Sequence, residues 1–212
     1  MDKFERVRAI FGNDFEKLRQ AKVLLLGVGG VGGFCLDGLY RSGVEDITMV
    51  DFDSFELTNQ NRQIGSEAVG EIKVKKLHQI YPKTTPIQAK IDENWVTSMN
   101  FAKFDLVIDA IDDMDAKITL ALNVSTPFIS SMGGAKKIDP TYIKYDSIWN
   151  TKGDPLAKAF RQRLRKAGFS GDFEVVYSDE ISKCQGMGSF VGVTGSFGLA
   201  LCALAVRKIL EK

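Results

Sequence analysis

Residues that commonly carry metal or acid–base chemistry are scarce in this sequence of 212 residues. It contains one histidine, His78, and three widely separated cysteines, Cys35, Cys184 and Cys202. Because no two cysteines form a CxxC pair, a structural zinc site of four cysteines is excluded within one chain. The odd number favours free thiols. His78 lies in a predicted helix between apolar neighbours, which favours a structural role and leaves no strong candidate for a general base.

Long apolar stretches and an excess of charge of one sign are also missing. The formal net charge is +1, so any contact with nucleic acid must come from a local patch. The one apolar run that resembles a membrane span, 195–210, is shorter than the usual length of about 20 residues and carries Arg207 and Lys208. It predicts a buried helix rather than an integral span. The N-terminus has no apolar core of the signal-peptide type. We therefore expect a cytoplasmic protein, and peripheral attachment to a membrane stays open.

Strand-like and helix-like segments alternate along the chain. A strand at 22–26, a helix at 33–42 and a strand at 46–50 form a β–α–β unit, and such units make parallel sheets. The predicted strands continue at 86–91, 104–110, 127–131, 142–145 and 173–177, and the other predicted helices lie at 2–11, 14–21, 73–81, 116–123, 154–167 and 191–210. This order predicts one Rossmann-like, doubly wound α/β domain with a mainly parallel sheet and helices on both faces.

The first β–α–β unit contains a glycine-rich loop, GVGGVG, at 27–32. Because the loop follows a strand and opens a helix, its glycines let the backbone approach phosphate groups at the helix N-terminus. An acidic residue is expected about 20 residues later to hold a ribose, and Asp51 lies there, with Asp53 after it. The unit therefore predicts a nucleotide site.

A later set of polar residues separates two kinds of nucleotide chemistry. With the glycine loop alone, a nicotinamide-dependent oxidoreductase fits as well as an ATP-dependent enzyme. Arg62, Lys73 and Asp112 favour ATP, because attack on its α-phosphorus builds negative charge that basic residues and a metal ion stabilise. Asp112 follows a buried strand, where ligands of open α/β sheets lie, and carboxylates suit Mg²⁺. We predict Arg62, Lys73 and Asp112 as catalytic residues, with Asp112 as the metal ligand.

Five motifs together carry a family resemblance: GVGGVG, VDFD, TNQNRQ, VGEIK and VIDAID, at 27–32, 50–53, 58–63, 69–73 and 107–112. Over roughly residues 1–135 the chain resembles the ubiquitin-activating-type adenylyltransferases, which include bacterial activators of sulfur-carrier proteins. The resemblance implies a homodimer in which an arginine of one subunit, Arg6 or else Arg8, reaches the partner's ATP. The implied nucleotide-binding residues are Gly27, Gly29, Gly30, Gly32, Asp51, Asp53, Asn59, Arg62, Lys73 and Arg6.

The C-terminal half narrows the resemblance. It lacks the two CxxC pairs usual in sulfur-carrier activators, and it has KIDPT at 137–141, GDPL at 153–156 and GSFV at 188–191. With these motifs in this order, the chain resembles the tRNA threonylcarbamoyladenosine dehydratases. The stretch between Phe173 and Cys184 is shorter than in longer members, which leaves the exact substrate open. We expect residues 1–135 to bind the nucleotide and residues 136–212 to serve substrate and dimer contacts.

The resemblance implies ATP-dependent cyclisation of threonylcarbamoyladenosine in tRNA through an acyl-adenylate, with Mg²⁺ as cofactor. A monovalent cation, K⁺ or Na⁺, and a sulfurtransferase or desulfurase partner stay open. Three alternatives remain: adenylation of the C-terminal glycine of a sulfur-carrier protein, a non-catalytic nucleotide-binding protein, and a nicotinamide-dependent oxidoreductase.

A basic helix is predicted at 154–167. Lys158, Arg161 and Arg165 share one face at three- and four-residue spacing, opposite the apolar Leu156, Phe160 and Leu164. This face is either solvated or part of a phosphate-contacting patch for tRNA. The predicted patch also includes Arg163, Lys166, Lys136 and Lys137.

Overall fold

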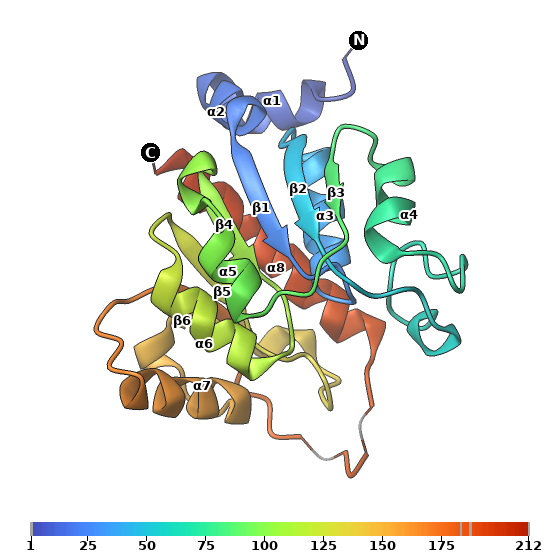
Figure 1. Cartoon of the computed structure of the whole chain (residues 1–212). Coiled ribbons are helices and arrows are strands. Elements are labelled where there is room, and N and C mark those ends of the chain that lie inside the picture. The colour runs from blue at the N-terminus through green and yellow to red at the C-terminus, as the bar shows by residue number, and fades with distance from the viewer. Residues whose placement is uncertain (1, 183, 187, 212) are drawn as a thin grey trace.

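The computed structural model describes residues 2–182, 184–186 and 188–211. Its centre is a seven-stranded sheet with the order β3-β2-β1-β4-β5-β7-β6 (Figure 1). Neighbouring strands are parallel except β6, which runs antiparallel to β7 at one edge. The predicted Rossmann-like class is confirmed. The strands are β1 (Lys22–Leu26), β2 (Asp46–Val50), β3 (Thr85–Ile87), β4 (Leu106–Asp109), β5 (Phe128–Ser131), β6 (Ile143–Ser147) and β7 (Glu174–Ser178).

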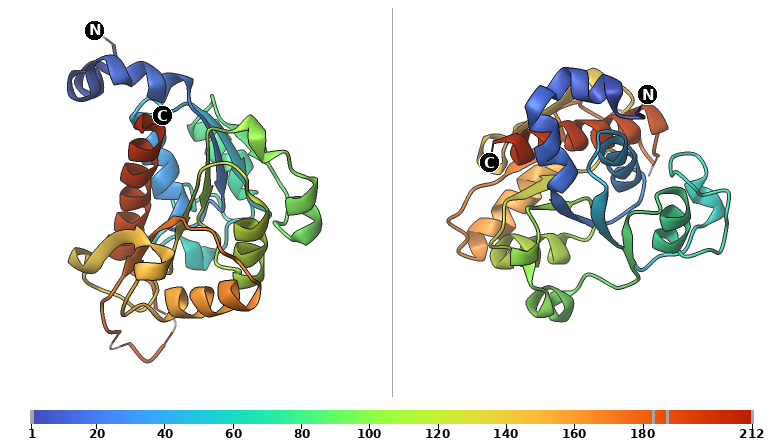
Figure 2. Two further views of the ribbon diagram at one scale, coloured as in Figure 1. Left: turned by 90° about the vertical axis from the view of Figure 1, so that its left-hand side faces the viewer. Right: turned by 90° about the horizontal axis from the view of Figure 1, so that it is seen from above.

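Helices cover both faces of the sheet (Figure 2). One face packs against α3 (Gly32–Arg41), α4 (Lys73–Ile80) and α8 (Val191–Leu210), and these elements share one apolar cluster. The other face packs against α5 (Glu93–Ser98), α6 (Met114–Asn123) and α7 (Pro155–Lys166) through two further clusters. Two short helices, α1 (Glu5–Phe11) and α2 (Phe15–Gln20), lie near the amino-terminal ends of the strands. The short connecting 3-10 helices include η2 (Leu57–Asn59) and η3 (Phe101–Lys103).

The central strands are apolar because they are buried on both faces. Four residues of β1, Val23 to Leu26, have no exposed surface, and every residue of β4 is buried. Uninterrupted apolar runs are typical of parallel strands between two helical layers. The carboxyl ends of β1, β2 and β4 consequently meet at one edge of the sheet, where the candidate site lies.

Helix α8 is long and apolar enough to cross a membrane by length and composition, and 61% of its apolar window is buried inside the protein. It packs along α3 and across four strands of the sheet. At Gly198 the backbones approach so closely that a Cβ atom would lie 2.4 Å from the carbonyl oxygen of Val31. This packing agrees with the predicted buried helix.

One predicted strand needs correction, and one helix was not predicted. The strand predicted at 86–91 ends at Ile87, and residues 93–98 form α5, which the sequence analysis did not identify. Asp92 starts this helix by accepting a hydrogen bond from the Trp95 N–H at 2.9 Å. A helix of six residues shows less than two turns of apolar periodicity, so the pattern was too short to detect.

Candidate active site

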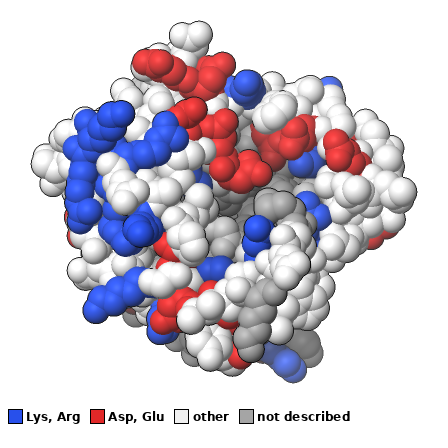
Figure 3. All heavy atoms as spheres, turned by 90° about the horizontal axis from the view of Figure 1, so that it is seen from below, with Lys and Arg blue, Asp and Glu red and all other residues white. Residues whose placement is uncertain are grey.

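A cavity of about 650 Å³ opens at the carboxyl ends of the central strands. The space-filling view from below shows a hollow with acidic side chains along its upper rim and a group of Lys and Arg to its left (Figure 3). Most of the predicted site residues line this cavity: Gly27, Gly29, Gly30, Asp51, Asp53, Arg62, Lys73 and Asp112. Three predicted residues, Gly32, Asn59 and Arg6, are outside this lining set. Residues far apart in sequence thus meet where open α/β sheets bind ligands.

The glycine loop has room for a ligand on one side and none on the other. A Cβ atom at Gly29 would have its nearest neighbour, Gln63 Nε2, at 3.7 Å, so the cavity side is open. Gly32 instead packs behind the loop, where a Cβ atom would lie 1.9 Å from the carbonyl oxygen of Gly27. Gly27 has a φ of +84° and also lies against the backbone of Ala110. The loop therefore needs glycine for close packing of strand, turn and helix.

Replacing Gly32 with alanine is expected to destabilise the fold by roughly 1–3 kcal/mol and to weaken ATP binding at least about tenfold, because the loop must shift to admit the methyl group. Gly33→Ala is the matched control, since its Cβ atom would lie 3.6 Å from the Val28 oxygen, an ordinary contact. Alanine in α3 should leave the stability equal or slightly raised. Thermal unfolding and ATP titration of both variants would test this, and equal behaviour of the two would contradict it.

Asp51 at the end of β2 ties the glycine loop to the sheet. Its two carboxylate oxygens accept hydrogen bonds from the backbone N–H groups of Val28 and Asp53, each at 2.9 Å. The side chain is mostly buried but borders the cavity. A carboxylate has about four acceptor positions, so two remain for a ligand hydroxyl. This geometry suits the predicted ribose contact.

Lys73 is held at the cavity wall by Asp53. The Lys73 ammonium lies 2.9 Å from Asp53 Oδ2, and the Lys73 N–H donates to the Asp53 carbonyl at 3.0 Å. The lysine side chain is 7% exposed, whereas that of Asp53 is 45% exposed. The start of α4 thereby points a nearly buried cation into a cavity that otherwise contains several carboxylates.

Arg62 lies against the glycine loop, and Asn59 supports its segment. The Arg62 guanidinium donates to the Thr58 carbonyl and to Asn61 Oδ1, both at 2.8 Å. Asn59 is buried, and its side chain accepts from the Glu56 N–H at 3.1 Å to cap the short helix η2. In this conformation Asn59 orders the turn that carries Arg62.

Asp112 and Asp113 follow β4 and have different roles. Asp113 accepts hydrogen bonds from the N–H groups of Asp115 and Ala116 and so caps α6. Asp112 is exposed to the cavity, and no hydrogen bond or ion pair among the described residues engages its carboxylate. The described part of the chain has no cluster of three metal-ligating side chains. A free carboxylate fits Mg²⁺, which takes one or two carboxylates together with phosphate oxygens and water.

A buried polar cluster behind the cavity was missed by the sequence analysis. Lys117 of α6 has no exposed surface, and its ammonium lies 2.8 Å from Asp109 Oδ2, 2.9 Å from the Ser131 carbonyl and 3.2 Å from Ser130 Oγ. Asp109 also accepts from the Ile111 N–H at 3.1 Å. The cluster connects the loop that carries Asp112 with the end of β5. The sequence offered one signal for this cluster. Lys117 precedes Leu120 and Ala121 by three and four residues, so it lies on the apolar face of the predicted helix.

Lys137 is a correction to the predicted basic patch. It is buried, and its ammonium donates to Asp154 Oδ2 at 2.9 Å and to the Ser178 carbonyl at 2.6 Å. Asp154 also caps α7 by accepting a hydrogen bond from the N–H of Ala157. Lys137 therefore connects the segment after β5 to the start of α7 and is not available to a phosphate.

The cysteines give no sign of thiol chemistry. All three are free, with Cys35 and Cys202 buried as expected for core residues. Burial raises the pKa of Cys35 and raises that of Cys202 to about 12, so both stay protonated near neutral pH. Cys184 is exposed and lies outside the cavity lining.

The fold and this site define a nucleotide-binding protein of the adenylyltransferase kind, and the comparison with families agrees: residues 4–212 match the ThiF family, to which the chain belongs. It is 38% identical over 192 residues to the tRNA threonylcarbamoyladenosine dehydratase of Bacillus subtilis, covering 85% of this chain and 76% of that protein. The E. coli tRNA N6-threonylcarbamoyladenosine dehydratase in complex with AMP superposes with a TM-score of 0.91 at 28% identity, covering 99% of this chain and 94% of that chain. Its complex with ATP gives a TM-score of 0.89 at 29% identity over the same shares.

Proposed function

We propose that the protein catalyses the ATP-dependent cyclisation of threonylcarbamoyladenosine in tRNA, a dehydration through an acyl-adenylate. The observation that carries the proposal is the single cavity in which the glycine loop, Asp51, Arg62, Lys73 and Asp112 meet. The relatives named tRNA threonylcarbamoyladenosine dehydratase, and the E. coli structures with ATP and AMP, support the substrate and the nucleotide. A tRNA substrate agrees with the predicted cytoplasmic location.

The nucleotide occupies the half of the cavity formed by the glycine loop and by the residues from Asp51 to Asp112. Gly27, Gly29 and Gly30 offer backbone to the phosphates, with Gly32 packed behind them, and Asp51 accepts from the ribose. Arg62 and Lys73 face the negative charge that develops at the α-phosphorus, with Asp53 and Asn59 holding their segments. Asp112 would hold Mg²⁺, which would supply further charge stabilisation. A monovalent cation, K⁺ or Na⁺, and a sulfurtransferase or desulfurase partner stay open, with no residues assigned to either.

The modified nucleoside occupies the other half of the cavity. Gly133, Gly134 and Ala135 line it with little side-chain volume, and residues of the second part of the chain, Leu156 and Thr194 among them, complete the wall. The threonyl carboxylate attacks the α-phosphorus and pyrophosphate leaves. The carbamoyl group of the same nucleoside then attacks the acyl carbon with loss of a proton, the ring closes and AMP leaves. Both reacting groups belong to one nucleoside, so the second step is intramolecular.

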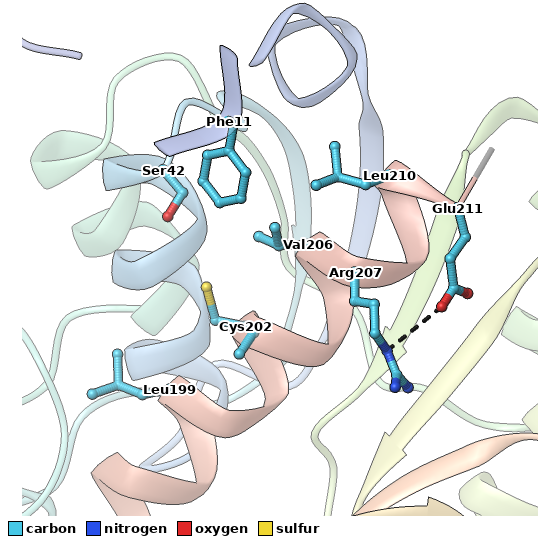
Figure 4. Close-up of a pocket in the computed structure, with 9 residues that line it drawn as sticks. Phe11, Ser42, Leu199, Cys202, Val206, Arg207, Leu210 and Glu211 are labelled. Atoms are coloured by element: carbon cyan, nitrogen blue, oxygen red, sulfur yellow. Dashed lines mark ion pairs between the residues drawn. The ribbon is translucent and has the colours of Figure 1, made fainter. Parts of the chain in front are cut away.

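A homodimer completes the proposal. Arg6 is exposed on α1, at the end of the sheet opposite its own cavity, so it can serve only a partner's site. Beside α1 a second cavity of about 600 Å³ has an apolar wall of Phe11, Leu199 and Val206 (Figure 4). Ile10 and Leu199 are 79% and 51% exposed there, and such a surface suits a second copy. Light scattering of the purified protein would test the dimer.

The proposal is tested by incubating the protein with Mg-ATP and tRNA that carries threonylcarbamoyladenosine, followed by digestion and mass spectrometry of the nucleosides. We expect an ATP-dependent product lighter by one water, with AMP released. A protein that binds ATP but yields neither product would favour a carrier-protein substrate, which pyrophosphate exchange with candidate carriers would then identify. Absence of turnover with every such substrate would favour the non-catalytic alternative.

A further inference from the structure

Helix α7 concentrates positive charge on a protein that is nearly neutral overall. Its twelve residues contain five basic and no acidic side chains, PLAKAFRQRLRK, whereas the whole chain has 28 basic and 27 acidic residues. Ala157, Phe160 and Leu164 are buried in the core, and the basic side chains occupy the remaining faces. Figure 3 shows the corresponding group of Lys and Arg to one side of the hollow.

Most of this charge is not used inside the protein. Within the described residues, Arg163 is the one basic side chain of α7 that forms an ion pair, with the exposed Asp115. Arg161 donates to the Thr151 hydroxyl, and Arg165 lies 5.3 Å from the ring centre of Trp149. Lys158, Arg165 and Lys166 are exposed. Neither contact of the two arginines neutralises their charge.

Stabilisation of the helix itself does not account for the pattern. Basic residues in the last turn interact favourably with the helix dipole, which explains Arg163, Arg165 and Lys166. The same dipole disfavours cations near the start of a helix, yet Lys158 lies there and the first turn has no acidic residue. The N-cap Asp154 supplies the favourable negative charge at this end, so the dipole gives no reason for Lys158.

The basic face begins at the cavity. Leu156 in the first turn of α7 lines the nucleoside half, beside Gly133 and Gly134. From there α7 extends about 18 Å, because its twelve residues rise 1.5 Å each. In the proposed function a cavity of about 650 Å³ takes the nucleotide and one nucleoside, so the rest of the RNA stays outside, next to the start of α7.

We infer that α7 is the surface that binds the RNA backbone next to the modified nucleoside, with Lys158, Arg165 and Lys166 as its phosphate contacts. This inference rests on the proposed function for the nature of the RNA. In this inference α7 recognises the charge and shape of the RNA backbone, and the cavity recognises the modified base. This division is expected for a protein without a common RNA-binding module.

The test compares two triple variants with equal change in charge. The α7 variant is Lys158→Gln, Arg165→Gln and Lys166→Gln. The control variant is Lys22→Gln, Lys75→Gln and Lys103→Gln, three exposed lysines outside the cavity lining. The probe for binding is an unmodified tRNA transcript at several salt concentrations. We expect the α7 variant to bind roughly 10- to 100-fold more weakly at low salt, with a salt slope reduced by about 2–3, while the control and ATP binding stay unchanged.

Turnover separates this inference from the proposed function. With modified tRNA the α7 variant should show a raised KM and an unchanged kcat. Equal tRNA affinity and KM for the α7 variant and wild type would overturn the inference and leave the proposed function intact. Binding of the transcript through α7 without any dehydrated product would support the inference and count against the proposed function. Binding of anionic phospholipid vesicles but not of the transcript would overturn the inference.

Discussion

Replacing Lys117 with methionine is expected to lower the free energy of unfolding by about 3–5 kcal/mol. Lys117 and Asp109 both have side chains with no exposed surface, so loss of the ammonium leaves a buried carboxylate without its cation. The Ser131 carbonyl also loses a hydrogen bond. A control on the surface, Lys75→Met, should change the stability by less than about 0.5 kcal/mol. Chemical unfolding of the variants provides the measurement.

A second variant distinguishes loss of charge pairing from loss of packing. In Asp109→Asn combined with Lys117→Met, no unpaired charge is left, and the amide side chain that replaces the Asp109 carboxylate can still accept from the Ile111 N–H and donate to Ser130 Oγ. The double variant should therefore be more stable than Lys117→Met alone. If both variants lose equal stability, or if Lys117→Met unfolds like wild type, the buried ion pair does not hold the two strand ends together.

Replacing Asp112 with asparagine is expected to reduce kcat by roughly 10²–10³-fold without changing the melting temperature. The substitution keeps the size of the side chain and removes the carboxylate that we propose as the Mg²⁺ ligand, so charge developing on the phosphates should be less stabilised. The fold should tolerate it because Asp112 is exposed and, in the described part of the chain, makes no hydrogen bond or ion pair. ATP binding without Mg²⁺ should be retained.

The neighbouring carboxylate supplies the matched control. Asp113 lines the same cavity and caps α6, and asparagine is an equally good N-cap, so Asp113→Asn should be close to wild type in stability and rate. Turnover of modified tRNA by both variants, with a Mg²⁺ titration, checks the assignment. A full rate for Asp112→Asn, or loss of rate only in Asp113→Asn, would assign the metal to a different carboxylate.

The local sequence was sufficient to predict most of the helices and strands. The strands Lys22–Leu26 and Asp46–Val50 and the helix Val191–Leu210 were predicted with the bounds that the structure has. Their signals are strong because central strands read as continuous apolar runs and the glycine loop interrupts them. The sequence did not predict helix α5, because its six residues span less than two turns and show too little apolar periodicity.

The sequence by itself determined the class of fold and most of the predicted residues that line the cavity, because parallel strands bring their carboxyl ends, and the loops that follow them, to one edge of the sheet. Only the tertiary structure decided which lysines are buried in ion pairs and which stay exposed to solvent. Lys117 and Lys137 are buried in ion pairs with Asp109 and Asp154, whereas Lys158 stays in solvent. A charged side chain can be buried only where a distant segment supplies its counter-charge and hydrogen bonds, and local sequence does not show those long-range contacts.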